Sequence, residues 1–233
     1  MSDKKTIKDS KMTKSVIWVV LLAWLAIVLI LGANETLARD PGTPPLLLLI
    51  AVLAPIIVFL AAYWSVGRFR DLVLSMDLQF AAGIQAWRLG GLGFIALYAY
   101  GVLPGLFAWP AGLGDMSIGF TAAWVLRTLR DRPDFVKSGA YRTWNLLGIL
   151  DLVTAVSLGA LSAYLGIGIT ETITTFPMAR LPLVLIPAFL VPLFIMLHVS
   201  SLIQSRKLAA AGKNCAWVGQ RIQCGREETM AKA

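Results

Sequence analysis

Residues 46–66 read LLLLIAVLAPIIVFLAAYWSV, a stretch without a charged side chain. A helix needs about 20 mostly apolar residues to cross the hydrocarbon core of a bilayer, so this stretch predicts a transmembrane helix. Five further stretches predict the same. The six predicted spans are residues 16–32, 46–66, 84–103, 111–126, 143–166 and 181–203. We therefore expect an all-α, polytopic integral membrane protein with six transmembrane helices.

The composition supports one membrane domain. Of the 233 residues, 58% are hydrophobic and 15% are charged, whereas a soluble domain carries roughly a quarter charged residues. A chain of this length cannot bury so much apolar surface within itself, so lipid must solvate the remainder. We expect a basic N-terminal segment (1–15), a membrane domain (16–204) and a polar tail (205–233).

The basic residues sort between the predicted spans. With six crossings, all but two of the 21 lysines and arginines fall on one side, the exceptions being Arg39 and Arg180. Cytoplasmic connections carry such an excess, so both termini are expected in the cytoplasm, with the spans in a bacterial-type inner membrane. The short segment 111–126 has a re-entrant loop as its alternative, but the charge pattern favours a crossing. We favour an uncleaved first span over a cleaved signal peptide, because its apolar run exceeds a signal-peptide core.

Two features concern the cytoplasmic face of the membrane. The net charge is +8, and the basic residues flank the apolar spans. This distribution favours contact with anionic lipid over binding to a nucleic acid. Between the second and third spans, residues 67–85 alternate apolar and polar positions at helical spacing. This pattern predicts one amphipathic helix that lies on the bilayer surface. A homo-oligomer or another membrane protein remains a candidate partner.

Three ionisable residues lie inside the predicted spans: Asp115, Asp151 and His198, the only histidine. Such side chains are costly in hydrocarbon and often mark functional sites. From the helical rise, Asp115 lies about 6 Å below the outer surface, Asp151 about 12 Å in from the cytoplasmic side and His198 about 8 Å in. These depths are staggered and do not require one cluster.

Neighbouring residues indicate how these side chains are used. Small residues share the helix faces of Asp151 and Asp115, which favours packed interfaces over lipid. Arg88 is a candidate ion-pair partner for Asp151, and Asn145 and His198 are candidate hydrogen-bond partners. Asp151 has two open interpretations, a polar clasp between helices or a group that carries chemistry. For Asp115 we favour a cap at its helix start, near the positive end of the dipole. For His198 we favour an interhelical hydrogen bond.

The sequence lacks the motifs of common catalytic and cofactor sites. It has no Cys-x-x-Cys-His, His-Glu-x-x-His, Gly-x-Ser-x-Gly or Walker A pattern. One histidine cannot supply bis-histidine haem ligation. Cys215 and Cys224 are a weak metal pair, and we interpret them as free thiols in the polar tail. We expect no metal and no cofactor, and we favour a non-enzymatic role.

Two functions from different classes follow. The leading hypothesis is a bundle that moves a proton, an ion or a small solute, with Asp151 as the exchanging group, His198 as the cytoplasmic relay and Asp115 as the outer gate. Pro187 and Pro192, which predict kinks in the last span, add a candidate hinge. The alternative is a non-catalytic assembly factor, sensor or complex subunit, in which the polar residues are clasps. An intramembrane enzyme that acts on lipid is the third and weakest hypothesis.

Overall fold

The computed structural model describes residues 2–38, 43–165 and 173–210, and these form helices and turns without a strand. The all-α expectation is therefore confirmed for this part of the chain. Cys215, Cys224 and the rest of the predicted tail beyond residue 210 lie outside the described residues, as does residue 166 at the end of the predicted fifth span. The elements are α1 (Ser2–Ala33), α2 (Leu46–Ser65), α3 (Gly67–Leu74), α4 (Leu78–Gly83), η1 (Ile84–Gly91), α5 (Leu92–Ala99), α6 (Gly105–Asp131), η2 (Pro133–Lys137), α7 (Gly139–Leu165), η3 (Phe176–Ala179) and η4 (Ile186–Leu190).

Five helices of the described chain are long and apolar enough to cross a membrane, as in a multi-pass membrane protein. They are Ser15–Ala33, Leu46–Ser65, Leu78–Ala99, Gly139–Tyr164 and Ile186–Ala210. We call Leu78–Ala99 the third helix; it consists of α4, η1 and α5 in succession. We call the fifth the C-terminal helix. The remaining long helix, α6, has 27 residues and is about 40 Å long, but it is not apolar enough to belong to this set.

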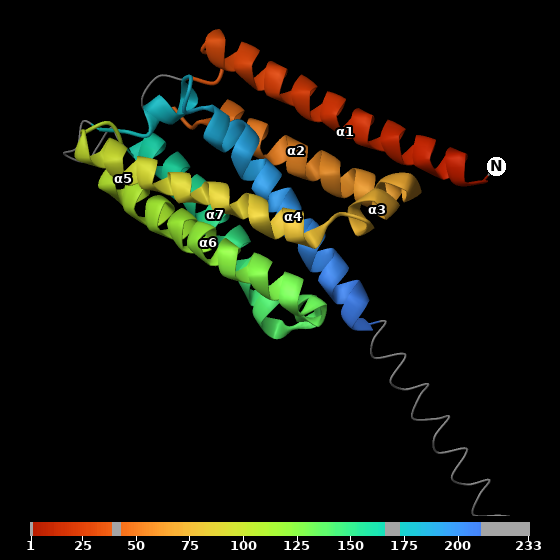
Figure 1. Cartoon of the computed structure of the whole chain (residues 1–233). Coiled ribbons are helices and arrows are strands. Elements are labelled where there is room, and N and C mark those ends of the chain that lie inside the picture. Colours follow the sequence, from red (N-terminus) through yellow and green to blue (C-terminus); the bar gives the residue numbers. More distant parts are fainter. Residues whose placement is uncertain (1, 39–42, 166–172, 211–233) are drawn as a thin grey trace, which may run out of the picture.

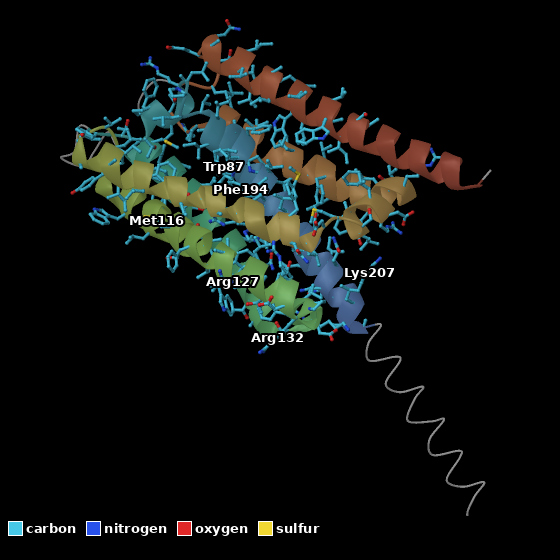
Figure 2. All side chains as sticks on the ribbon, viewed as in Figure 1. Trp87, Met116, Arg127, Arg132, Phe194 and Lys207 are labelled. Atoms are coloured by element: carbon cyan, nitrogen blue, oxygen red, sulfur yellow. The ribbon has the colours of Figure 1, made fainter. Side chains whose placement is uncertain are left out.

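The long helices run back and forth, so that successive connections lie at opposite ends of the molecule (Figure 1). Arg127, Arg132 and Lys207 lie at the end where α1 begins and the C-terminal helix ends (Figure 2). We call this the basic end. The connection between α5 and α6 lies at the opposite end, as do the described parts of the connections between α1 and α2 and between α7 and the C-terminal helix (Figure 1).

The helix α1 lies at the edge of the bundle beside α2 and the C-terminal helix (Figure 1). It packs through Val28, which is buried against Val184 and Ala188, and through Trp24, whose ring lies 4.6 Å from that of Phe189. Most of its other apolar side chains from residue 15 onward are exposed, which suits a helix surrounded by lipid. α1 begins at Ser2, so the predicted N-terminal segment 1–15 is largely part of the same helix.

The region between the second and third predicted spans is not one continuous helix. A single amphipathic helix over 67–85 is wrong, because α3 ends at Leu74 and a new helix begins at Leu78. Asp77 causes this restart, since its carboxylate accepts the backbone N–H groups of Gln79 at 2.8 Å and Phe80 at 3.4 Å. The third helix consequently starts six residues before the predicted position, Ile84.

Other helices also extend past their apolar runs. α6 begins at Gly105 instead of residue 111, and α7 begins at Gly139 instead of residue 143. The C-terminal helix is shifted toward the basic end, because it starts at Ile186 and continues to Ala210 instead of spanning 181–203. Its first turn, η4, is a π-helical turn that contains Pro187. π turns are a recognised cause of helix bending.

Candidate functional site: a buried arginine cluster

The third helix places Arg88 inside the bundle. Residues 84–91 form a 3₁₀ helix, in which side chains three positions apart fall on one line. Gln85, Arg88 and Gly91 share this line, and all three are buried. The line faces α6 at very close range: a Cβ added to Gly91 would lie 2.9 Å from the Gly112 carbonyl, and one added to Gly119 would lie 2.6 Å from the Leu89 nitrogen. Glycines on both helices thus bring the two backbones together, as the small-residue face of α6 predicted.

Arg88 joins α6 and α7 through direct hydrogen bonds. Its Nε donates to Asp115 Oδ1 at 2.6 Å, and its Nη2 donates to Asp151 Oδ2. Its Nη1 donates to the carbonyl of Gly148 at 3.3 Å. The side chain of Arg88 is 1% exposed, whereas those of Asp115 and Asp151 are 14% and 15% exposed. The predicted pairing of Arg88 with Asp151 is present, and Asp115 is a second partner.

His198 on the C-terminal helix extends this network to Asn145 on α7. Arg88 Nη1 lies 3.3 Å from His198 Nε2, and a guanidinium has only donors, so Nε2 is the acceptor. His198 Nδ1 lies 2.9 Å from Asn145 Oδ1. The Asn145 amide is oriented by its own Nδ2, which donates to the Tyr141 carbonyl at 2.8 Å. The imidazole is therefore neutral, with its proton on Nδ1.

All five candidate residues from the sequence thus belong to one network, which we call the Arg88 cluster: Arg88, Asp115, Asn145, Asp151 and His198. The staggered depths predicted for the ionisable residues are wrong. Because α6 begins at Gly105, Asp115 lies about 15 Å along its helix, and it is paired with Arg88 instead of capping the helix start. Asp151 lies about 18 Å from the start of α7, so the two carboxylates meet near mid-helix.

The Arg88 cluster carries an uneven charge. It contains one guanidinium, two carboxylates and a neutral imidazole, so it holds one negative charge in excess when both carboxylates are ionised. Within the described chain, neither carboxylate has another basic partner. A buried charge without compensation is costly. The cluster is therefore suited to bind one proton or one cation. The guanidinium of Arg88 contacts all three of Asp115, Asp151 and His198. The described residues contain no group of three histidine, cysteine, aspartate or glutamate side chains that could hold a metal ion.

Two buried polar side chains on the basic-end side of the cluster were missed by sequence reasoning. Gln85 is 1% exposed, and neither of its side-chain amide atoms has a hydrogen-bond partner within the described chain. The Tyr141 hydroxyl lies beside Ser201 and Asn145 but makes no hydrogen bond of normal geometry. Buried groups of this kind commonly bind ordered water. One sequence feature does indicate that Gln85 is buried: it lies three residues before Arg88 in a glycine-rich segment.

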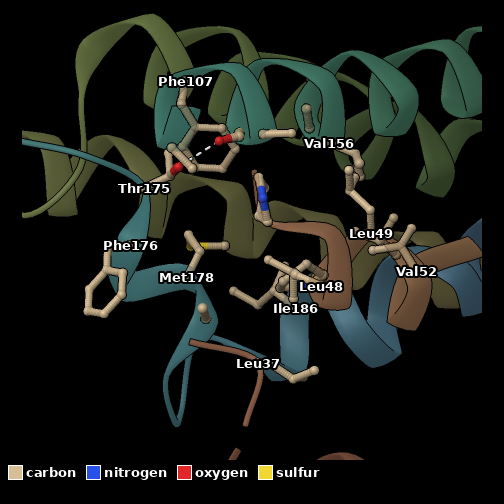
Figure 3. A pocket seen from close by; sticks show the side chains of 18 of the residues that line it. Leu37, Leu48, Leu49, Val52, Phe107, Val156, Thr175, Phe176, Met178 and Ile186 are labelled. Carbon is tan, nitrogen blue, oxygen red and sulfur yellow. Dashed lines mark hydrogen bonds between the residues drawn. The ribbon is translucent and has the colours of Figure 1, made fainter. Parts of the chain in front are cut away.

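A narrow cavity opens on the opposite side of the cluster, toward the end away from the basic residues. It encloses about 80 Å³. Its walls come from α2, α5, α6, α7, the segment 174–179 and the C-terminal helix (Figure 3). Apolar side chains dominate these walls, including Leu48, Val52, Phe107, Ala155, Val156 and Ile186. Asp115 is the only charged residue among those that line it, so the cavity leads from this end of the bundle to the cluster.

Long apolar helices around a buried ion-pair cluster define the class of a multi-pass α-helical membrane protein. The chain matches a domain of unknown function, DUF8737, over residues 45–205, which is more than half of its length, so it belongs to this family. The matched region runs from α2 to the C-terminal helix and includes every residue of the Arg88 cluster, while α1 lies outside it. No curated protein and no solved structure matches the chain.

Proposed function

We propose that this protein moves a proton, an ion or a small solute through its helical bundle, and that the Arg88 cluster is the site where the moving charge binds. The observation that carries this proposal is the excess of carboxylates over cations inside the bundle. One arginine serves both Asp115 and Asp151, so one carboxylate can exchange a proton or cation without leaving Arg88 unpaired.

The proposal gives each polar residue a role along one route. Asp115 is the gate on the cavity side, because it both lines the cavity and pairs with Arg88. Asp151 is the exchanging group. His198 is the relay toward the basic end, where it contacts Asn145. Gln85 and the Tyr141 hydroxyl, both without partners in the described chain, supply places where water could continue the route.

The membrane arrangement is part of the same proposal. We propose that α6 is a sixth crossing, since it is long enough and runs between connections at opposite ends (Figure 1). The basic end then faces the cytoplasm and its anionic lipid, in a bacterial-type inner membrane. A polar α6 is tolerated there because its Asp115 pairs with Arg88 inside the bundle and is not presented to lipid.

Flux measurements test this proposal. Purified protein is reconstituted in vesicles that contain a pH-sensitive dye, and a pH gradient is imposed. We expect flux above that of protein-free vesicles, and we expect Asp151→Asn to abolish it, because an amide cannot exchange a proton. Flux that is unchanged in Asp151→Asn, or the absence of any flux, would contradict the proposal.

Asp134→Asn is the matched control for this experiment. Asp134 is an exposed carboxylate in η2, and a 2.7 Å hydrogen bond from Lys137 holds its pKa below the usual range. Its hydrogen bond and ion pair are with Lys137 and with no member of the Arg88 cluster. Removal of this charge is expected to leave the flux unchanged.

A second function has its own supporting observation. The Arg88 cluster ties together the third helix, α6, α7 and the C-terminal helix, as a clasp in a non-catalytic assembly factor, sensor or complex subunit would. In that case Asp151→Asn lowers stability or association and no flux exists to abolish. Co-purification from native membranes in mild detergent, with wild type and Asp151→Asn compared, distinguishes this function from transport.

A further inference from the structure

The cavity combines an apolar wall with an acidic floor. Most of its lining residues are aliphatic or aromatic, and the threonines Thr43, Thr174 and Thr175 lie where the chain connects helices at the end away from the basic residues. Asp115 lies in the middle of α6, so it forms the deep part of the cavity. A molecule that fills this space must therefore be apolar along its length and meet a carboxylate with one end.

The carboxylate of Asp115 has capacity for a ligand. Arg88 Nε occupies its Oδ1, and within the described chain no hydrogen bond is made to its Oδ2. Since the Arg88 cluster has one negative charge in excess, a cation at Oδ2 would balance it. An anion at the same position would meet two carboxylates that share a single guanidinium, and this is unfavourable in a site with little water.

The dimensions of the cavity limit the apolar part of the ligand. Its volume of about 80 Å³ is smaller than that of an apolar cavity of roughly 150 Å³ that binds benzene. A slot of this size holds the ammonium group and the first carbons of a linear amine, and the rest of the chain extends along the apolar wall and out through the open end of the cavity. Small residues of α7, among them Ala155, Gly159 and Ala160, form one wall and leave the space open.

We propose that this cavity binds an amphiphilic amine, a slim aliphatic molecule with one ammonium group that forms an ion pair with Asp115. This inference rests on the proposed function and names the class of solute that the bundle would carry. A proton and the ammonium group would then compete for the same excess negative charge, which is the condition for exchange of one for the other.

Three probes with the same chain and different head groups test the inference: hexylamine, hexanol and hexanoate. Binding is measured by calorimetry at pH 7 on the full-length protein in nanodiscs, with empty nanodiscs subtracted. We expect hexylamine to bind at least tenfold more tightly than hexanol, and hexanoate more weakly than either. Asp115→Asn should weaken hexylamine at least tenfold and leave hexanol unchanged, while Asp134→Asn should change none of the three.

A second variant tests the apolar wall independently of charge. Ala160→Leu narrows the cavity and should weaken hexylamine and hexanol alike, whereas Ser157→Leu, an exposed position on the same helix outside the cavity lining, should weaken neither. Equal binding of the three probes, or unchanged hexylamine binding in Asp115→Asn, would overturn the inference and identify the cavity as a slot for a lipid chain.

The two proposals fail in different ways. If hexylamine does not bind while Asp151→Asn still abolishes proton flux, the solute class is wrong and the transport function stands. If hexylamine binds to Asp115 but the vesicles show neither proton flux nor uptake of hexylamine, the cavity is a binding site and the transport function is wrong.

Discussion

The centre of the cluster requires an arginine and not a lysine, because the hydrogen-bond acceptors around it lie in several directions. The guanidinium reaches Asp115 through Nε, Asp151 through Nη2, and both Gly148 and His198 through Nη1. Its planar group holds five donors in fixed positions, whereas a lysine ammonium is a single point charge. The guanidinium therefore holds four side-chain and backbone groups from three helices in place at once.

Arg88→Met should be strongly destabilising. It leaves Asp115 and Asp151 buried without a counter-charge, and breaking a buried pair in this way costs about 3–5 kcal/mol. The triple variant Arg88→Met, Asp115→Asn, Asp151→Asn removes the charges together and should recover most of this loss. Chemical unfolding in detergent, followed by circular dichroism, measures both. A triple variant as unstable as Arg88→Met would show that packing of the arginine stem, and not charge, is what the cluster contributes.

The tautomer of His198 can be tested directly, since the chain contains one histidine. Arg88 Nη1 faces Nε2, and Asn145 Oδ1 faces Nδ1 at 2.9 Å. In protein labelled with ¹⁵N-histidine we expect a neutral ring with the proton on Nδ1 at pH 7. In Asn145→Leu this orientation loses its acceptor, and the Nδ1–H population should fall. A wild-type spectrum with the proton on Nε2 would mean that Arg88 does not donate to His198.

Sequence reasoning found the members of the cluster but not their meeting point. The cost of a lone charge in hydrocarbon predicts a pair between Arg88 and Asp151, and the structure contains that pair. Hydropathy predicts a position near the surface for Asp115, because the apolar run starts at residue 111, whereas α6 starts at Gly105. A hydropathy profile detects where a run of apolar residues begins. It does not detect the first turns of a helix, which remain helical outside the hydrocarbon.

At the scale of elements, the contact between the third helix and α6 sets the position of Arg88. Gly119 allows the Arg88–Leu89 backbone to lie against α6, since a Cβ there would be 2.6 Å from the Leu89 nitrogen and 3.0 Å from the Arg88 carbonyl carbon. A side chain at this position cannot be accommodated by rotation of a neighbour, because the obstructing atoms belong to backbone. The two helices would have to separate.

Gly119→Ala should therefore destabilise the bundle by about 1–3 kcal/mol, the usual cost of overpacking. Gly93→Ala is the matched control, because a Cβ added there meets nothing within 4 Å; it should be neutral or slightly stabilising, as glycine is unfavourable within a helix. Thermal unfolding of both variants in the same detergent gives the comparison. Equal midpoints for the two would indicate that the third helix and α6 are not in close contact.

The small-residue face of α7 shows where element-level patterns are ambiguous. The sequence predicts close helix packing along the face formed by Gly148, Asp151, Ala155, Gly159, Ser162 and Gly166, of which Gly166 lies outside the described residues. Gly148 does pack closely, since a Cβ there would collide with the His198 ring. Ala155 and Gly159, however, line the cavity. Small residues permit either a close helix or an empty space, and only the path of the neighbouring helices decides between them.

At the scale of the whole molecule, the family match and the packing agree on what forms the central unit. Residues 45–205 contain the Arg88 cluster and the walls of the cavity apart from Leu37 and Thr43. α1 precedes this region and covers the C-terminal helix from outside through Val28. We infer that the cluster and the cavity belong to the family domain, and that α1 supports them from the periphery.

The number of crossings is the remaining whole-molecule question, and α6 decides it. Tyr100, 84% exposed, precedes α6 at the end away from the basic residues, and Lys137 follows α6 at the basic end. If α6 crosses, these two positions lie on opposite sides of the membrane. We expect Tyr100→Cys, in a background with Cys215→Ser and Cys224→Ser, to react with an impermeant maleimide in intact spheroplasts.

Lys137→Cys in the same background should react only after the membrane is permeabilised, and the cysteine-free background should not react in either state. The reason is electrostatic, since the basic residues of η2 and its neighbours favour the cytoplasmic side. Reaction of both cysteines from one side would mean that α6 does not cross. Asp115 would then have to reach Arg88 from a helix outside the hydrocarbon core, and a route from the cavity through the Arg88 cluster to the basic end would no longer connect two compartments.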